Sequence, residues 1–362
     1  MIDRIHQQGG NEDLHLFTEG DDLIDAMLAD IAISHTEILL EMYIFKEDKV
    51  GRQFVTALLQ ASARGVSIQI RLDALGSGRV FTQATASKLR ECGVAFSWDN
   101  QWNCWHPLRY QRRNHRKLLV IDERIAYVGG FNIGEESSFR FSGAARWRDT
   151  HVRLMGPIAK QAAVLFRSYR NTNACGEERW FGHNLLMSNY SRRCRYRLRC
   201  LFNGRFRNAR SKIWLTTPYF VPDSRTQRLL MKAAGRGIDV RILLPGKSDI
   251  PVTQWAARMS YARLARSGVR IYEYAPRFLH AKTIVIDHDW STVGTSNFDY
   301  RSFFRNHELN FVSISDDINR CLSKYFEEDL MCAKEIDLHI LENIGIANIF
   351  QRLIAFFARK YL

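Results

Sequence analysis

The stretch that decides the fold reads HRKLLVID and spans residues 115–122. It recurs 165 residues later as HAKTIVID at 280–287. After six further residues, the first copy is followed by GGFN at 129–132 and the second by GTSN at 294–297. A block repeated at constant internal spacing indicates two copies of one structural unit.

The similarity between the two halves extends upstream of these motifs. SARGVSIQIRLDALGS at 62–77 resembles AGRGIDVRILLPGKSD at 234–249, and LRECGVAFSW at 89–98 resembles LARSGVRIYE at 264–273. In each pair, a helix that ends near a glycine precedes an apolar, β-branched strand. We therefore predict an α/β fold with two pseudo-two-fold-related halves, each a mixed, largely parallel sheet flanked by helices.

Three segments are expected along the chain. The first half covers 1–185, the second half 186–340, and an amphipathic C-terminal helix 341–362. In the last segment apolar residues recur at helical spacing, which is typical of a core-facing helix and also of a helix in a membrane interface. The stretch 191–210 contains eight arginines. It forms either a solvated helix face or a contact surface for anions.

The overall charge is strongly basic. Lys and Arg number 52 against 38 Asp and Glu, a net charge of +14 that favours polyanions such as nucleic acid or anionic lipid headgroups. The N-terminus lacks the apolar core of a secretory signal, and no apolar run approaches the ~18 residues of a membrane-spanning helix. Any membrane association is expected to be peripheral. The seven cysteines are scattered without zinc-site spacing, and we expect free thiols.

Each motif places a histidine and a lysine two residues apart, on one face of a strand. Two facing copies would put two imidazoles and two ammonium groups into one cleft. One imidazole can attack the phosphorus of a phosphodiester, the other can protonate the departing alkoxide, and the lysines can neutralise the phosphate oxygens. Because cationic side chains supply this chemistry, we expect no metal and no cofactor. The predicted catalytic residues are His115, Lys117, Asp122, His280, Lys282 and Asp287.

Four further polar residues are candidates for supporting roles. Asn132 and Asn297, on the glycine-containing turns, are predicted to donate hydrogen bonds to the phosphate oxygens. Asp149 and Glu308 each stand at the head of an apolar strand, one per half. A carboxylate on the far ring nitrogen would fix the tautomer of a histidine. The alternative for these carboxylates is a surface pair with nearby arginines.

The duplicated HxKx4Dx6GxxN block resembles the phospholipase D superfamily. Other stretches resemble its bacterial cardiolipin synthase branch, and the similarity covers roughly residues 13–335. These stretches are LLEMYIFKEDKVG at 39–51, HPLRYQRRNHRK at 106–117, WRDTHVRLMGP at 147–157, TPYFVPD at 217–223 and GTSNFDYRSFFRNHELN at 294–310. One departure is the serine of the family's GSxN pattern, which is Gly130 in the first half and Thr295 in the second.

The resemblance implies a two-step phosphatidyl transfer through a phospho-histidine. Phosphatidylglycerol is the usual donor, the hydroxyl of a second lipid or polyol is the acceptor, and cardiolipin is the usual product. The family usually assigns the first-motif histidine as nucleophile, whereas the symmetry of the residues leaves that order open. The implied partner is an anionic phospholipid membrane. We expect peripheral attachment to the cytoplasmic face of a bacterial inner membrane.

Other activities are compatible with the same motifs. A hydrolytic phospholipase D would use water as the acceptor, and a nucleic-acid phosphodiesterase would suit the basic charge. Simple nucleases of the superfamily have one motif and dimerise, and its DNA-repair members replace the motif aspartate, so nucleic acid is not expected. Two intact motifs also disfavour a lipid-binding module without catalysis.

Overall fold

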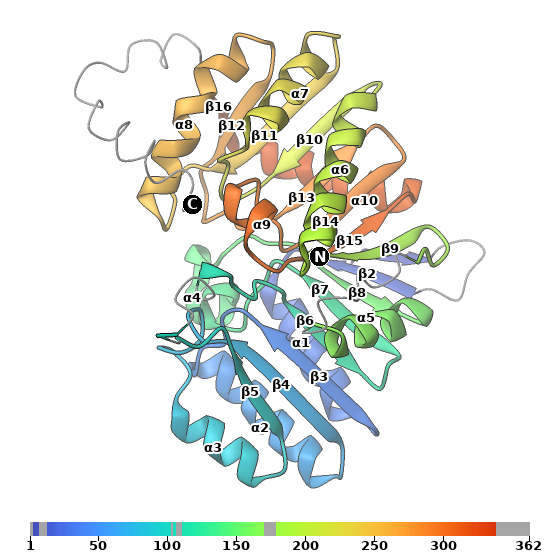
Figure 1. Cartoon of the computed structure of the whole chain (residues 1–362), viewed down its shortest axis with the longest axis vertical. Coiled ribbons are helices and arrows are strands. Elements are labelled where there is room, and N and C mark those ends of the chain that lie inside the picture. Colours follow the sequence, from blue (N-terminus) through green and yellow to red (C-terminus); the bar gives the residue numbers. More distant parts are fainter. Residues whose placement is uncertain (1–2, 7–12, 103, 106–110, 170–178, 338–362) are drawn as a thin grey trace.

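Two eight-stranded sheets organise the molecule, one in each half of the chain (Figure 1). The structure is a computed structural model that describes residues 3–6, 13–102, 104–105, 111–169 and 179–337. The predicted C-terminal helix at 341–362 lies outside these residues. The strands form where apolar, β-branched runs occur, as in LLVI at 118–121 and TIVI at 283–286.

The first sheet has the strand order β1-β2-β8-β7-β6-β3-β4-β5. Its strands are β1 Asp3–His6, β2 Asp13–Phe17, β3 Glu37–Met42, β4 Ser67–Asp73, β5 Ala95–Asp99, β6 Leu118–Ile121, β7 Ile125–Gly129 and β8 His151–Met155. Its helices are α1 Gly20–Ala32, α2 Lys49–Ala63, α3 Gln83–Glu91, α4 Phe139–Ser142 and α5 Pro157–Arg167.

The second sheet has the order β16-β12-β11-β10-β13-β14-β15-β9. Its strands are β9 Asn184–Ser188, β10 Lys212–Thr216, β11 Asp239–Pro245, β12 Arg270–Tyr274, β13 Thr283–Ile286, β14 Trp290–Gly294, β15 Leu309–Ser313 and β16 Ala333–Glu335. Its helices are α6 Arg192–Asn208, α7 Ser224–Ala234, α8 Pro251–Ala265, α9 Tyr300–Phe304 and α10 Asp316–Met331.

The two halves repeat one topology, which confirms the predicted architecture of paired mixed sheets. In each, three parallel strands (β3-β4-β5 and β10-β11-β12) adjoin an antiparallel meander (β6-β7-β8 and β13-β14-β15). The parallel part is smaller than expected, because the motif strands pair antiparallel with β3 and β10. The hairpins after the motifs turn through residues with positive φ, among them Asp122 at 52° and Asp287 at 51°.

The sheets also indicate where one half ends and the next begins. β9 belongs wholly to the second sheet, where it pairs with β15. A boundary at 185/186 cuts this strand, and a limit before Asn184 agrees better with the hydrogen bonding. By topology, β9-α6-β10 in the second half corresponds to β2-α1-β3 in the first.

One apolar core joins the halves. It contains side chains from the motif strands β6 and β13, from their neighbours β7, β8, β14 and β15, and from helices α5 and α10. Two further cores lie under α1 and α2 in the first half and under α6, α7 and α8 in the second. Because the central core belongs to both halves, the motif strands have fixed positions relative to each other.

One of the described cysteines differs from the expectation of free thiols. Cys92, Cys104, Cys200, Cys321 and Cys332 form no disulfide bond. Cys194, which is buried at the start of α6, is disulfide-bonded.

Candidate active site

Backbone hydrogen bonds between the halves hold both motif histidines. The N–H of His115 donates to the carbonyl of His307 at 2.9 Å, and the N–H of His280 donates to the carbonyl of Arg148 at 2.7 Å. His307 and Arg148 lie just before β15 and β8, the last meander strands of the two halves. Each histidine is therefore anchored on the half to which it does not belong.

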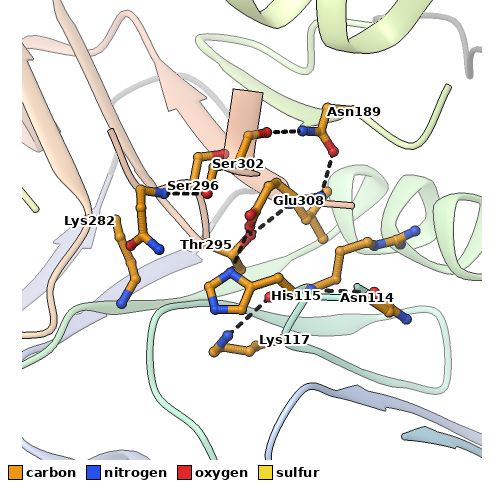
Figure 2. A network of polar contacts seen from close by, with 12 residues as sticks. Asn114, His115, Lys117, Asn189, Lys282, Thr295, Ser296, Ser302 and Glu308 are labelled. Atoms are coloured by element: carbon orange, nitrogen blue, oxygen red, sulfur yellow. Dashed lines mark hydrogen bonds and ion pairs between the residues drawn. The ribbon is translucent and has the colours of Figure 1, made fainter. Parts of the chain in front are cut away.

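The carboxylates that contact the two imidazoles are also exchanged between halves. His115 Nδ1 lies 2.9 Å from Glu308 Oε2, and His280 Nδ1 lies 2.5 Å from Asp149 Oδ2. All four side chains are buried. Figure 2 shows the His115–Glu308 contact and the bonds around it. A carboxylate on Nδ1 keeps the proton there and leaves Nε2 to face a substrate.

A residue of the glycine-containing turn packs against each of the two carboxylates, and its size suits the length of the carboxylate side chain. Thr295 Oγ1 donates to Glu308 Oε2 at 2.5 Å. In the first half, a Cβ on Gly130 would lie 2.0 Å from Asp149 Oδ1, so only glycine fits under this carboxylate. The departure from the family's serine is thereby explained, since Gly130 accommodates an aspartate and Thr295 bonds to a glutamate.

The two lysines are buried beside the histidines. Lys117 Nζ donates to the carbonyl of His115 at 3.0 Å, and Lys282 Nζ donates to that of His280. Lys282 Nζ also lies 3.7 Å from Asp149. Two buried cations thus share a small region with two buried carboxylates, so the four charges balance one another within the site.

Burial lowers the pKa of all four basic groups. It is the main reason that the pKa of Lys117 falls to about 7, with the charge of Lys282 second, and that the pKa of Lys282 falls to about 8. Burial likewise lowers the pKa of His115 and His280, against the opposing effect of Glu308 and Asp149. Near neutral pH both imidazoles of the empty site are therefore neutral.

A cavity of about 360 Å³ opens onto both histidines. Asn132 and Asn297, the predicted phosphate-binding residues, are part of its wall. Leu75 and Ile250 line it as well, and they are 39% and 44% exposed, so part of the wall near solvent is apolar. The cavity thus combines polar side chains with apolar ones near solvent, and such a lining suits an amphiphilic molecule.

The motif aspartates lie elsewhere, and this corrects their predicted place in the catalytic set. Asp122 accepts bonds from the N–H groups of Thr36 and Glu37 at the start of β3, at 2.8 and 2.9 Å. Asp287 does the same for Ser211 and Lys212 at the start of β10. Both are at the far ends of their motif strands from the histidines. Their role in the structure is to join neighbouring strands.

Several side chains of the site were not predicted from the sequence. The ring of Tyr43 lies 4.8 Å from that of His115, and Trp147 lies 4.9 Å from His280. Asp299 and Asn306 line the cavity as well. The sequence offered one signal for Trp147 and Asn306: each stands two positions before a predicted orienting carboxylate, Asp149 or Glu308.

A buried polar network lies under His115, whereas the equivalent positions beside His280, which the structure also describes, are apolar. Asn114 Nδ2 donates to Glu41 Oε1 at 2.5 Å and to Asp99 Oδ2 at 2.8 Å, and Arg116 pairs with Glu41 at 3.2 Å. The positions that correspond to Asn114 and Arg116 in the second motif are Leu279 and Ala281, which belong to the shared apolar core. The two histidines therefore differ in their surroundings despite the duplication.

Comparison with known proteins agrees with this geometry. Residues 27–162 and 204–330 match the family described as "Cardiolipin synthase, PLD-like domain". The chain belongs to this family. It is 32% identical over 352 residues to a cardiolipin synthase of Clostridium perfringens, covering 92% of this chain and 74% of the relative. It is also 33% identical over 340 residues to cardiolipin synthase 2 of Bacillus anthracis, covering 88% and 65%.

Solved structures show the same fold. A phosphatidylserine synthase of Haemophilus influenzae superposes with a TM-score of 0.72 at 12% identity, over 100% of this chain and 97% of that one. In the described part of this chain, no helix is both long and apolar enough to cross a bilayer. Nor do the described residues include three His, Cys, Asp or Glu side chains grouped to hold a metal ion.

Proposed function

We propose that this phosphatidyltransferase of the cardiolipin synthase type moves a phosphatidyl group from phosphatidylglycerol to the hydroxyl of a second phosphatidylglycerol. The observation that carries the proposal is the pair of histidines that open onto one cavity, each with a buried carboxylate on Nδ1. Two such histidines with two buried lysines form a site for double displacement at a phosphodiester.

In the first step, Nε2 of one imidazole attacks phosphorus, and a phosphorus–nitrogen bond replaces the bond to the headgroup glycerol. The other imidazole, protonated because the bound phosphate anion raises its pKa, gives its proton to the departing glycerol oxygen. Lys117, Lys282, Asn132 and Asn297 stabilise the charge on the non-bridging oxygens.

In the second step, the same imidazole removes the proton of the incoming hydroxyl. The acceptor oxygen attacks phosphorus, the phosphorus–nitrogen bond breaks, and the first histidine is regenerated. The products are cardiolipin and glycerol. We expect no metal or cofactor to take part.

A lipid assay tests the proposal. Purified protein with phosphatidylglycerol vesicles is expected to produce cardiolipin and free glycerol, and His115→Ala and His280→Ala are each expected to abolish turnover. Accumulation of phosphatidic acid alone would assign the chain to hydrolysis. Substantial turnover by either variant would contradict a site that needs both histidines.

Peripheral binding to an anionic membrane is part of the proposal, and α6 supports it. Its N-terminal half exposes Arg192 and Arg193, while Cys194 and Leu198 face the protein. Burial and the charges of Arg112 and Arg192 lower the pKa of Arg195 to about 10, so several cations are close together here. Arg112 is the neighbour of the cavity residue Arg113, so this basic surface adjoins the site.

A vesicle assay with a matched control tests this surface. Arg192→Gln with Arg193→Gln should reduce sedimentation with phosphatidylglycerol vesicles severalfold, and high salt should reduce it similarly. Lys88→Gln with Lys160→Gln removes the same charge from exposed positions on α3 and α5 and should leave sedimentation unchanged. An equal reduction of sedimentation by the two double substitutions would show that vesicle binding depends on net charge and not on this surface.

Two locations have to be distinguished: the cytoplasmic face of a bacterial inner membrane, which is the expectation from the sequence, and the opposite face. The disulfide at Cys194 favours the opposite face, because disulfides persist mainly in oxidising compartments. Protease treatment of intact spheroplasts distinguishes the two faces. If the protease degrades the native chain, the chain lies on the outer face of the membrane.

A further inference from the structure

The cavity wall is asymmetric at positions that the duplication makes equivalent. Trp147 and Asn306 each precede the residue whose carbonyl accepts the N–H of a motif histidine. One is a large apolar ring and the other a small amide. Likewise Gly134, five residues after the first glycine of GGFN, corresponds to Asp299 after GTSN. The second half thus supplies two polar groups that the first half lacks.

Asp299 and Asn306 flank α9 and are almost completely buried. Asp299 is 5% exposed, and its Oδ1 caps α9 by accepting from the N–H of Ser302 at 2.7 Å. Asn306 is 6% exposed, and among the described residues its Oδ1 has no hydrogen-bond partner. Both side chains line the cavity that contains the histidines. A buried acceptor without a partner is costly unless a ligand satisfies it.

The chemistry of this wall identifies the part of a substrate that it can contact. A carboxylate and an amide oxygen accept hydrogen bonds, so they suit hydroxyl groups and repel phosphate oxygens. A cationic headgroup fits less well, because Arg113 and Arg301 line the same cavity. Burial, with a contribution from Glu308, raises the pKa of Asp299 to about 7, which reduces its negative charge and suits a neutral ligand.

We propose that Asp299 and Asn306 form a subsite for the vicinal hydroxyls of a glycerol headgroup. The inference rests on the proposed transferase function and extends it to headgroup selection. In a double displacement, the leaving alcohol and the attacking alcohol occupy the same side of phosphorus. One subsite therefore serves the departing glycerol of the donor and the entering glycerol of the acceptor.

A competition experiment tests the subsite. Phosphatidylglycerol vesicles are incubated with the full chain and equal concentrations of labelled glycerol, 1-propanol and ethanolamine. The alcohols compete for the same phospho-enzyme, so the product ratio is independent of the first step. The test variants are Asp299→Ser, which retains a helix-capping oxygen, and Asn306→Leu, which retains volume. The control is Thr253→Val, which removes a cavity-lining hydroxyl already bonded to the carbonyl of Ile250 at 2.6 Å.

In both variants the ratio of glycerol to propanol transfer should fall about tenfold, as for the loss of a hydrogen bond to a substrate hydroxyl. Formation of phosphatidylpropanol should continue, and the control should retain the wild-type ratio. An unchanged ratio in both variants, or equal loss of all products, would overturn the subsite. Selective loss of ethanolamine transfer would assign the wall to an ammonium group and also overturn it. A wild-type protein without any phosphatidyl product would instead refute the transferase function, and the subsite with it.

Discussion

At the scale of single residues, the exchanged carboxylates make each histidine dependent on the other half of the chain. His115 and Glu308 are 193 residues apart in sequence but 2.9 Å apart in space. The carboxylate fixes the imidazole with its proton on Nδ1, and this orients the lone pair of Nε2 toward the cavity. Removing the negative charge while keeping the side-chain shape isolates that function.

We expect Glu308→Gln and Asp149→Asn each to lower kcat by about 10²–10⁴-fold, because an amide can donate to Nδ1 and stabilise the wrong tautomer. Cardiolipin formation from phosphatidylglycerol vesicles measures the effect. Asp25→Asn is the matched control, since it removes an exposed carboxylate paired with Arg140 on α4. A kcat within tenfold of wild type in both Glu308→Gln and Asp149→Asn would show that the carboxylates do not orient the imidazoles.

The buried lysines predict the alkaline limb of the pH profile. Lys117 and Lys282 must be protonated to neutralise the phosphate oxygens, and their pKa values are lowered to about 7 and about 8. Because kcat/KM reports the free enzyme, it should fall as pH rises through this range. The measurement is initial rates at low substrate concentration between pH 6 and 9.5.

The control is the Tm of the protein, measured over the same pH range as the rates. A lysine with a folded pKa of about 7 and an ordinary unfolded pKa near 10.5 binds fewer protons in the folded state between those values. The free energy of unfolding therefore rises with pH in this window. Activity should decline while Tm does not. A parallel fall of Tm would attribute the alkaline limb to unfolding.

At the scale of elements, the motif aspartates join strands rather than take part in chemistry. The spacing in HxKx4D contains this information, because His115 and Asp122 are seven positions apart, and an odd offset places two side chains on opposite sides of an extended strand. The motif strands themselves were predictable from their apolar runs. Their antiparallel pairing with β3 and β10 was not, since it depends on the direction in which the chain re-enters the sheet after β5 and after β12.

We expect Asp122→Ala to lower the free energy of unfolding by roughly 1–2 kcal/mol while leaving kcat nearly unchanged, because it removes hydrogen bonds to the start of β3. Chemical denaturation together with the lipid assay measures both quantities. Asp287→Ala should behave alike, as it occupies the equivalent turn. Loss of turnover in a folded Asp122→Ala protein would return this residue to the catalytic set.

At the scale of the whole molecule, the duplication was evident from the sequence but the pairing between copies was not. The place of each carboxylate just before an apolar strand indicates that Asp149 and Glu308 are equivalent, yet it does not show which histidine each one contacts. That depends on the shared core between the sheets, which is made by residues from both halves. The position of Asn306 in the cavity also depends on how the two halves pair, because its neighbour His307 bonds to the backbone of the other half.

We expect neither half to work alone. A fragment of residues 1–183 would expose the shared core and leave His115 without Glu308, so it should aggregate and lack turnover. Co-expression with residues 184–362 should restore activity in a one-to-one complex, measured by size-exclusion chromatography and the lipid assay. Activity in either fragment by itself would contradict the exchanged site.

The exchanged contacts also bear on how such a chain could have arisen. A single ancestral unit, with one histidine motif and one carboxylate, could not have assembled a working site within itself. It would have needed an identical companion related by a two-fold axis, giving one site at the centre of a homodimer. Joining two copies of the gene end to end would preserve that site and would allow the sequences of its two halves to diverge. Gly134 and Asp299, or Trp147 and Asn306, are then the record of mutations that a symmetric dimer could never have accumulated on one side only.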